Sequence, residues 1–514
     1  MQIPTHLLGP TEGVQIKRTL QRYPERVAFK DERGEQTYGE VYDLIARYQA
    51  VLEASGLHRG DGVAALGANR FEVWAIGAAV QAMGLYITWL HPMGSLADQT
   101  FQLDDSQVKA LIVDETYYEK RGRELADVAQ QSGLQISSMS PSDFARDLAT
   151  MAEEVGQQPF RTVALHDDLG IINYTGGTTG KPKGAYRTQF SLGPSTADIL
   201  ANFELPESPR YLLIPPMSHV AGTNVLPTLI KGGTVHLMNG FDPAKVLERI
   251  EQEQINFTLL VPTMVYALLD HPDLNTRDTS SLEYVLYGAS PMSEHRLREG
   301  LERIGPVFGQ LYGQTECYPV SVLSKADHQN PELLLSCGKP VESVDVRILD
   351  PLGEEAAIGE PGELCVRGRG AMRGYWQRED LTAQTIVDGW IHTGDIAKMD
   401  DQGYLYIVDR KKDMIISGGF NVFPREVEDA LTTHPAVAQA AVFGVPDEKW
   451  GEKVTAAVIL KSGHAADSAE LIAHVKELKG SVQAPKEILF PEAMPQTAVG
   501  KINKRALRDL ATDN

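Results

Sequence analysis

Short apolar runs alternate with amphipathic stretches along most of the chain. The run Val63-Ala64-Ala65-Leu66 precedes a helical pattern that begins at Arg70, and the run Leu85-Tyr86-Ile87-Thr88 follows it. Further strand-like runs occur downstream, with a helical stretch at 243–254 among them: 211–214, 234–237 and 257–261. Apolar runs of strand length separated by helical periodicity are typical of layered α/β folds. The pattern therefore predicts an α/β chain with substantial parallel sheet.

The pattern changes after about residue 335. Turns that contain glycine and proline separate short β-like runs at 344–349 and 363–367, which predicts a small β-rich subdomain. The charged cluster 409–413 then precedes a last segment with its own strand and helix patterns. We expect a domain boundary there, between a large N-terminal domain (1–409, layered α/β plus the β-rich subdomain) and a small α+β C-terminal domain (410–514).

Composition and charge restrict the partners. The 514 residues include 48 Lys and Arg against 69 Asp and Glu, a formal net charge of -21. This sign repels phosphate backbones and anionic lipid head groups, so nucleic acid and membrane surfaces are not expected partners. A polyanionic ligand would need local donors, such as backbone N–H groups and a few placed cations. The hydrophobic fraction of 42% is that of a folded protein with several compact units.

Cysteine usage and hydropathy bear on the location of the protein. Three cysteines without CxxC spacing predict neither a disulfide framework nor a thiolate zinc site, and a reducing cytoplasm fits best. The start has no basic segment followed by an apolar run, so we expect no secretory signal. The most membrane-like stretch, 73–90, contains Gln81 and two glycines. It predicts a buried helix that leads into a strand rather than a membrane span.

The apolar run 169–172 is followed by a glycine- and threonine-rich segment, YTGGTTGKPKG (174–184). Its glycines allow a tight turn that exposes N–H groups, its threonines add hydroxyl donors and its lysines add positive charge. These are the components of a phosphate-binding loop. It is not a Walker A loop, because Thr175 and Pro182 stand where that motif has glycine and serine or threonine. The alternative interpretation is a flexible surface turn.

This segment resembles the signature of the adenylate-forming superfamily, which includes the acyl-CoA synthetases. Further matches follow in the family's order along nearly the whole chain: Pro216-Met217-Ser218-His219, Tyr287-Gly288-Ala289-Ser290-Pro291, Tyr312-Gly313-Gln314-Thr315-Glu316, Gly374-Tyr375, His392-Thr393-Gly394-Asp395, Asp409-Arg410-Lys411-Lys412-Asp413 and Gly500-Lys501-Ile502. Each motif is short, but their joint order and spacing are specific. The string DRKKDMIISGG (409–419) looks more like fatty-acyl and aryl-CoA ligases than acetyl-CoA synthetases.

The resemblance implies an AMP-forming acid–thiol ligase with ATP, Mg²⁺ and coenzyme A as cofactors. A carboxylate and a triphosphate are both anionic, so the first step needs cations and oriented donors. The family pattern assigns Glu316 to Mg²⁺, Thr315 to the α-phosphate, and Lys501 to a bridge between the acyl carboxylate and the phosphate oxygens. It assigns the phosphate loop to Thr175, Gly176, Gly177, Thr178, Thr179, Gly180 and Lys183.

Further roles follow from the same resemblance. Adenine would lie between the backbone of Gly288, Ala289 and Ser290 and the ring of Tyr312, and the ribose hydroxyls would be bound by Asp395 and Arg410. In this family the C-terminal domain moves between two poses, and Lys412 matches the hinge position, which places the hinge near 410–412. The residues Ser417, Gly418 and Gly419 match the strand along the pantetheine tunnel.

The acyl site is inferred from proximity to these motifs. Its expected wall residues are apolar or aromatic with few charges, and suit an aromatic or medium- to long-chain aliphatic acid: Val220, Asn224, Tyr287, Gly313, Cys317 and Tyr318. An α-amino acid is disfavoured, because the segment 216–222 has no aspartate to pair with an amino group. We expect His219 to face the acyl carboxylate or gate the site; a core histidine with satisfied hydrogen bonds is the alternative.

Several questions stay open at this stage. No carrier domain is recognised, so CoA is the expected acceptor; a separate acyl carrier protein and a homodimer are further partners considered. A non-catalytic nucleotide- or acyl-binding protein is the competing class, for which two departures from the family pattern, Gly176 and Gln189, give slight support. Val499 is a third departure, at a commonly small polar position. The presence of Lys501 and Glu316 argues against loss of catalysis.

Overall fold

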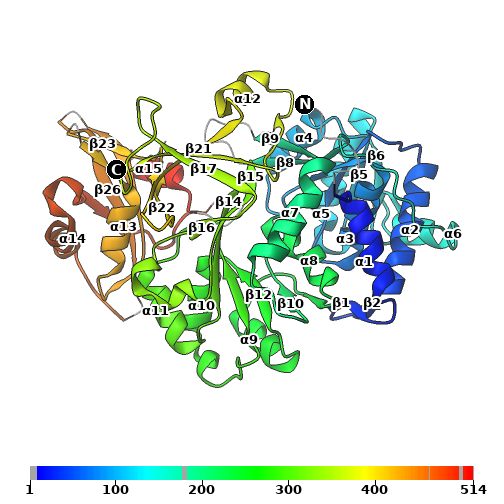
Figure 1. Cartoon of the computed structure of the whole chain (residues 1–514), viewed down its shortest axis with the longest axis horizontal. Helices are drawn as coiled ribbons and strands as arrows, with labels where there is room; N and C mark the ends of the chain where they lie inside the picture. Colours follow the sequence, from blue (N-terminus) through cyan, green and yellow to red (C-terminus); the bar gives the residue numbers. More distant parts are fainter. Residues whose placement is uncertain are drawn as a thin grey trace.

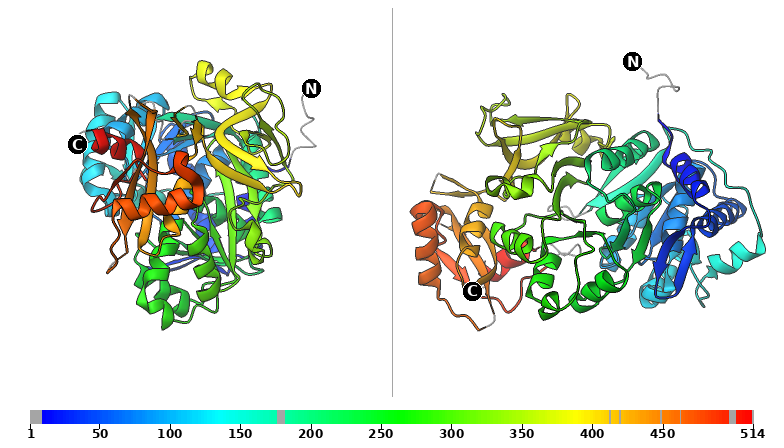
Figure 2. Two further views of the ribbon diagram at one scale, coloured as in Figure 1. Left: turned by 90° about the vertical axis from the view of Figure 1, so that its left-hand side faces the viewer. Right: turned by 60° about the horizontal axis from the view of Figure 1, so that its bottom comes forward.

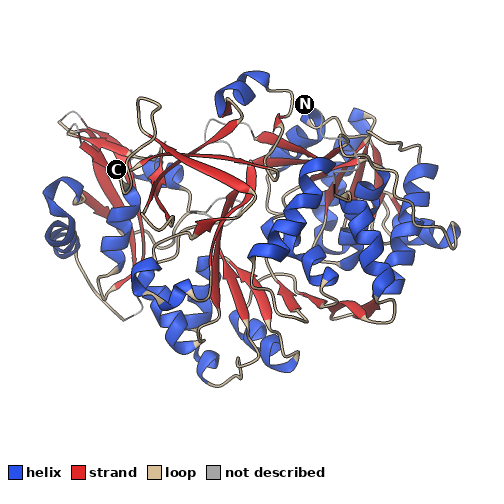
Figure 3. Ribbon diagram, in the orientation of Figure 1, coloured by secondary structure: helices blue, strands red, loops and turns tan. Residues whose placement is uncertain are grey.

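The computed structural model describes residues 9–175, 182–411, 413–418, 420–447, 449–461, 463–496 and 502–512. Two large sheets with helices form the N-terminal part, a smaller antiparallel sheet follows, and a fourth sheet with its own helices contains the C-terminal segment (Figures 1 and 3). The predicted α/β class, with a large N-terminal and a smaller C-terminal domain, is confirmed. The parallel strands, however, belong to two different sheets, which the sequence pattern did not distinguish.

The first large sheet contains the apolar runs nearest the N-terminus. Its strand order is β19 (Gly374–Tyr375), β9 (Lys183–Thr188), β8 (Leu169–Thr175), β4 (Tyr86–Trp89), β3 (Gly62–Leu66), β5 (Ala110–Val113), β6 (Gln135–Ser138) and β7 (Arg146–Asp147). The strands from β8 to β7 are parallel, whereas β9 and β19 add antiparallel pairs at one edge. The connecting helices are α3 (Phe71–Met83), α4 (Leu96–Asp105), α5 (Glu115–Ser132) and α6 (Leu148–Glu154).

The second large sheet has β1 beside a later strand. Its order is β16 (Lys339–Pro340), β15 (Cys317–Leu323), β14 (Phe308–Gln314), β13 (Tyr284–Tyr287), β12 (Phe257–Leu260), β10 (Arg210–Leu213), β11 (Thr234–Leu237), β1 (Val27–Asp31) and β2 (Gly34–Thr37). The predicted runs at 211–214, 234–237 and 257–261 and the predicted helix at 243–254 are confirmed. The helices of this part are α8 (Val225–Ile230), α9 (Pro243–Gln252), α10 (Pro262–Asp270) and α11 (Glu294–Arg303).

One hydrophobic core joins the two large sheets. It combines Val63 of β3 and Tyr211 of β10 with apolar side chains of α1 (Glu12–Arg22), α2 (Tyr38–Ala54) and α3, and α7 (Gln189–Asn202) adds Ile199. Helix α3 is buried from Ala75 to Met83 and ends at Gly84, whose φ of 71° suits a glycine C-cap. The membrane-like stretch is therefore a buried helix leading into a strand, as predicted. No helix in the described ranges is long and apolar enough to span a membrane.

The remaining two sheets follow the change of pattern near residue 335. The predicted β-rich subdomain contains β17 (Val344–Leu349), β18 (Gly362–Gly368), β20 (Ile386–Val387), β21 (Trp390–Met399) and β22 (Leu405–Arg410), with α12 (Glu379–Thr385) nearby. The C-terminal sheet contains β23 (Ile415–Ser417), β24 (Phe420–Val422), β25 (Val437–Asp447), β26 (Gly451–Leu460) and β27 (Glu487–Leu489), with α13 (Pro424–Thr432), α14 (Ser468–Gln483) and α15 (Lys504–Thr512). This orange-to-red unit lies at the end of the molecule opposite α1 and α2 (Figures 1 and 2).

Candidate active site

The strands β8 and β9 form a hairpin, and the predicted phosphate loop connects them in the sequence. Thr175 and Lys183 are paired opposite each other where the two strands end. The Lys183 ammonium lies 5.5 Å from the centre of the Tyr375 ring, which belongs to the adjacent strand β19. Five predicted loop residues lie outside the described ranges: Gly176, Gly177, Thr178, Thr179 and Gly180.

The turn between β14 and β15 presents Thr315 and Glu316 beside this hairpin. The Tyr375 hydroxyl donates a 2.7 Å hydrogen bond to Glu316 Oε1, and the Met372 N–H donates a 2.7 Å bond to the Glu316 carbonyl. The carboxylate is partly exposed, and its second oxygen can serve as a ligand for a hard cation. The described residues contain no cluster of three or more His, Cys, Asp or Glu that could hold a metal ion.

Arg187 is a cation of this site that the sequence analysis missed. It lies on β9, and its guanidinium donates to the Thr315 carbonyl, which links the phosphate hairpin to the Thr315–Glu316 turn. Its Nε atom is buried without a hydrogen-bond partner in the described part of the chain. Burial lowers the pKa of Arg187, against the opposing effect of nearby Cys317 and Glu316. The signal available in the sequence was an arginine three residues after the glycine- and threonine-rich segment 174–184.

Four side chains form a polar cluster where β14 meets β21 and β22. The Tyr312 hydroxyl and Gln314 Nε2 each donate a 2.6 Å hydrogen bond to Asp395 Oδ2. Arg410 Nε lies 3.4 Å from Asp395 Oδ1, because the two residues are direct partners in the antiparallel β21–β22 pair. Burial, followed by the Asp395 charge, raises the pKa of Tyr312, so its hydroxyl remains a donor. The structure thus brings together three predicted nucleoside residues and adds Gln314.

The segment that follows β13 has a backbone that requires small residues. A Cβ at Gly288 would lie 2.6 Å from the Leu311 carbonyl oxygen, so only glycine allows this approach. Ala289 has φ of 66°, a left-handed conformation that costs a non-glycine residue energy and is common at functional sites. Because β13 and β14 are parallel neighbours, this segment and Tyr312 lie at the same end of the sheet.

Three of the predicted acyl residues, Val220, Asn224 and Tyr318, lie in or beside the segment that follows β10. His219 precedes the 3₁₀ helix 220–224, and a Cβ at Gly222 would collide with the Met217 carbonyl oxygen at 1.9 Å. Ser218 Oγ lies 2.8 Å from His219 Nδ1. Thr223 Oγ1 donates to Val220 O at 2.7 Å and lies 3.4 Å from the Tyr318 hydroxyl oxygen, so Thr223 connects Val220 with Tyr318.

The other predicted wall residues are more buried. Asn224 is fully buried and its Oδ1 has no hydrogen-bond partner in the described part of the chain. Tyr287 is also buried, with its hydroxyl 3.2 Å from Gln310 Oε1 and 3.0 Å from His328 Nε2. A Cβ at Gly313 would lie 2.8 Å from the Tyr318 ring, and Cys317 is 1% exposed. Their contact with an acid remains a prediction.

Two of the predicted C-terminal site residues, Ser417 and Gly418, lie at the end of β23. Ser417 is buried, and Gly418 has φ of 59° and donates a 2.7 Å hydrogen bond to the Trp450 carbonyl. Next to the predicted hinge, Lys411 donates a 2.8 Å backbone bond to Gly394 and its ammonium lies 3.1 Å from Glu363 Oε2. Three predicted residues, Lys412, Gly419 and Lys501, lie outside the described ranges.

One departure from the family pattern has a structural explanation. Gln189 is fully buried on α7, and its side-chain amide donates to Gln81 of α3. Gln81 in turn donates a 2.9 Å bond to the Gly170 carbonyl of β8. Gln189 therefore connects two helices below the phosphate hairpin, whereas Gly176 and Val499 lie outside the described ranges.

The fold and this arrangement define an adenylate-forming enzyme. The family model described as "AMP-binding enzyme" matches residues 16–376, and that of its C-terminal domain matches residues 426–501. The chain belongs to this AMP-binding enzyme family.

Individual relatives locate the chain within the family. It is 47% identical over 489 residues to a medium/long-chain-fatty-acid–CoA ligase of Mycobacterium tuberculosis, covering 92% of this chain and 85% of the relative. It is 37% identical over 476 residues to a feruloyl-CoA synthase of Amycolatopsis, covering 92% and 93%. The solved amide bond synthetase of Marinactinospora thermotolerans superimposes with a TM-score of 0.89 at 32% identity, covering 97% and 99%. The predicted fatty-acyl and aryl-CoA ligase branch is confirmed, with its use of ATP, Mg²⁺ and CoA.

Proposed function

We propose that the protein is an ATP-dependent carboxylate–CoA ligase for an aromatic or a medium- to long-chain aliphatic acid. In the first step a carboxylate oxygen attacks the α-phosphorus of ATP, the bond to the bridging oxygen breaks, and acyl-adenylate and pyrophosphate form. In the second step the sulfur of CoA attacks the acyl carbonyl carbon, the thiol loses its proton, and AMP leaves. The two relatives that act on a fatty acid and on ferulate, at 47% and 37% identity, support this substrate range.

The polar cluster around Asp395 is the observation that best supports this function. Asp395 is 4% exposed, and its carboxylate accepts hydrogen bonds from Tyr312 and Gln314, with Arg410 at its other oxygen. A buried acid of this kind can accept two bonds from a ribose diol, with the Arg410 guanidinium donating beside it. We assign adenine to the space between Tyr312 and the 288–290 segment.

The residues beside this cluster fit the anionic first step. Thr315 and Lys183 supply a hydroxyl donor and a positive charge for the phosphates, and we add Arg187, whose guanidinium fixes the Thr315 carbonyl. Fixed donors and cations of this kind stabilise charge that develops in the transition state. Mg²⁺, held by Glu316, would neutralise phosphate charge. Lys501 would bridge the acyl carboxylate and the α-phosphate.

The second step requires the C-terminal domain to change its pose. We propose domains 1–409 and 410–514 with a hinge at 410–412, in which Lys412 changes conformation. Arg425 of α13 supports a defined docking surface: its guanidinium donates to Ile407 O at 2.7 Å and its N–H to Asp409 Oδ2 at 3.1 Å. The Ser417–Gly419 segment would line the pantetheine tunnel, because glycine leaves room for a narrow chain.

The acyl site is proposed around Val220, which directly follows His219, and around the buried side chains of Tyr318 and Cys317. We place the enzyme in the cytoplasm, supported by its three buried thiols without a disulfide: Cys317, Cys337 and Cys365.

The test is a product assay with the purified protein, ATP, Mg²⁺ and a panel of aliphatic and aromatic acids, with and without CoA, read by mass spectrometry. AMP together with an acyl-CoA is the expected result and identifies the acid. If the acyl-adenylate persists in the presence of CoA but is consumed when a phosphopantetheinylated carrier protein is added, the acceptor is a carrier protein rather than CoA. Nucleotide binding without conversion of any acid would favour the non-catalytic alternative and contradict the proposal.

A further inference from the structure

The segment that carries His219 lies where the two large sheets meet. It follows β10 of the second sheet, whereas the residues that contact it from the other side follow β3 and β4 of the first sheet. These are the carboxyl ends of parallel strands, the edge at which α/β proteins commonly place ligands. Two residues there, Asn69 and His91, have no role in the proposed chemistry.

Asn69 uses its whole side-chain amide on the segment before His219 and on the end of β11. Its Oδ1 accepts a 2.8 Å bond from the Met217 N–H. Its Nδ2 donates to the carbonyls of Ile214 at 2.9 Å, Pro215 at 3.3 Å and Met238 at 2.9 Å. The residue is 5% exposed, so these bonds are shielded from water. One buried amide thus fixes the backbone of the other sheet two residues before His219.

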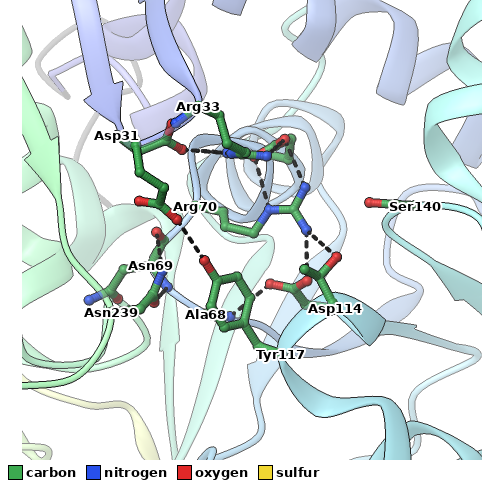
Figure 4. A network of polar contacts seen from close by, with 12 residues as sticks. Asp31, Arg33, Ala68, Asn69, Arg70, Asp114, Tyr117, Ser140 and Asn239 are labelled. Atoms are coloured by element: carbon green, nitrogen blue, oxygen red, sulfur yellow. Dashed lines mark hydrogen bonds and ion pairs between the residues drawn. The ribbon is translucent and has the colours of Figure 1, made fainter.

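Asn69 is itself held in place on both sides. The Ala68 N–H donates to Asp114 Oδ2 at 3.2 Å, and the Arg70 guanidinium donates to Asp114 Oδ1 at 2.7 Å (Figure 4). Asp114 is fully buried at the end of β5. Asn239 brackets the backbone of Asn69, accepting from its N–H at 2.8 Å and donating to its carbonyl at 3.3 Å. The amide of Asn69 therefore projects from a rigid point of the first sheet.

His91 contacts the side chain of His219 directly. The two imidazole centres lie 4.6 Å apart with the rings at 84°, an edge-to-face contact. His91 Nδ1 accepts a 3.0 Å bond from the Met93 N–H, and its carbonyl accepts a 2.8 Å bond from Gln99, so the ring is fixed by its own loop. Burial lowers the pKa of His91, which keeps this ring neutral near pH 7. A neutral ring can lie against His219 without charge repulsion.

We propose that Asn69 and His91 are positioning residues of the acid-binding site: Asn69 fixes the backbone before His219 and His91 fixes its ring. The inference rests on the proposed function, in which His219 faces the acyl carboxylate. Both residues reach His219 from the first sheet, so the acyl site is shaped by two sheets. Displacing a positioned group by about 1 Å can cost about a hundredfold in rate.

The test compares two pairs of variants by steady-state kinetics. His91→Ala removes the ring, whereas His91→Phe keeps an aromatic edge-to-face partner. Asn69→Ala removes the amide, whereas Asn256→Ala removes another buried amide at the opposite end of β10, where its Oδ1 accepts from the Arg210 N–H. We expect the KM for the acid to rise about tenfold in His91→Ala and Asn69→Ala and to stay within about twofold in the paired controls. The KM for ATP should stay within about twofold in all four variants.

Hydrogen exchange of the backbone amides of Ile214 and of residues 217–220 supplies a readout that needs no turnover. Faster exchange at Met217 in Asn69→Ala than in Asn256→Ala is expected. The inference is wrong if the exchange at Met217 is unchanged, or if the KM values for the acid and for ATP rise together. It is also wrong if the KM for the acid rises as much in His91→Phe as in His91→Ala. A wild-type enzyme that converts no acid would contradict the proposed function instead, and the exchange measurement would still decide whether Asn69 fixes the segment.

Discussion

The hydroxyl of Tyr312 lies 2.6 Å from the Asp395 carboxylate, although the two residues are 83 positions apart in the chain. Tyr312 is on β14 of the second large sheet, and Asp395 is on β21 of the smaller antiparallel sheet. This bond joins the surface proposed for adenine to the acid proposed for ribose. Nucleotide binding is therefore expected to depend on the relative position of two sheets.

Substituting Asp395→Asn tests the ribose assignment. The amide removes the charge opposite Arg410 and one acceptor, and hydrogen bonds to charged groups contribute about 1.5–3 kcal/mol, so the KM for ATP should rise about 10- to 100-fold. The KM for ATP can be measured from the rate at which pyrophosphate exchanges into ATP. Asp345→Asn is a matched control, because Asp345 pairs with Arg367 at an exposed position of the same sheet. An unchanged KM for ATP in Asp395→Asn would exclude the assignment.

Substituting Tyr375→Phe tests the orientation of Glu316. Loss of the 2.7 Å hydrogen bond frees the carboxylate to rotate, and groups that orient a metal ligand commonly contribute about 10- to 100-fold to metal affinity. The variant should therefore need about tenfold more Mg²⁺ than the wild type for the same ATP affinity. Calorimetric titration of ATP at a series of Mg²⁺ concentrations measures this. Tyr404→Phe is the control, since its hydroxyl donates a 2.7 Å bond to Asp327. Equal Mg²⁺ dependence in both variants would show that Tyr375 does not position Glu316.

Lys501→Ala should separate the two half-reactions. If this lysine bridges the carboxylate and the α-phosphate, adenylate formation should fall at least about a hundredfold, while thioester formation from preformed acyl-adenylate should stay within about threefold. Single-turnover assays of each half-reaction provide the comparison. Equal losses in the two assays would argue against a domain that alternates between poses.

Lys412→Pro should fix the proposed hinge. Proline restricts φ at about −65° and removes the N–H, so one domain pose should persist and one half-reaction should remain largely intact. Lys412→Ala keeps the backbone free and is expected to retain turnover. If Lys412→Pro keeps the overall turnover of the wild type, residue 412 is not the hinge.

The three cysteines should resist alkylation in the native protein. Burial raises the pKa of Cys317 and Cys365 to about 12 and that of Cys337 to about 11, so none is a thiolate near pH 8. Iodoacetamide followed by mass spectrometry should label them only after denaturation. Because the unfolded thiols ionise at lower pH than the folded ones, the free energy of unfolding should fall as the pH rises above about 9. Rapid native labelling at pH 8 would contradict the buried positions.

The hydrophobic pattern determined which segments become strands and helices. The predicted strands at 211–214 and 257–261 are confirmed because continuous apolar runs suit strands buried on both faces. The predicted helix at 243–254 is confirmed because its apolar residues recur on one face. The motifs also determined the family, since an anionic reaction requires glycines, threonines and lysines close together in the chain.

Only the tertiary structure decided which residues meet. Arg187 with Thr315, Tyr375 with Glu316, and Asn69 with Met217 are separated by 128, 59 and 148 positions. Each pair connects strands or loops of the two large sheets, and the hydrophobic pattern does not contain the order in which strands assemble. Side chains far apart in the chain approach only when the shared core fixes the sheets against each other. The sequence by itself therefore determined the type of chemistry, whereas packing between the sheets determined how the reacting groups are held.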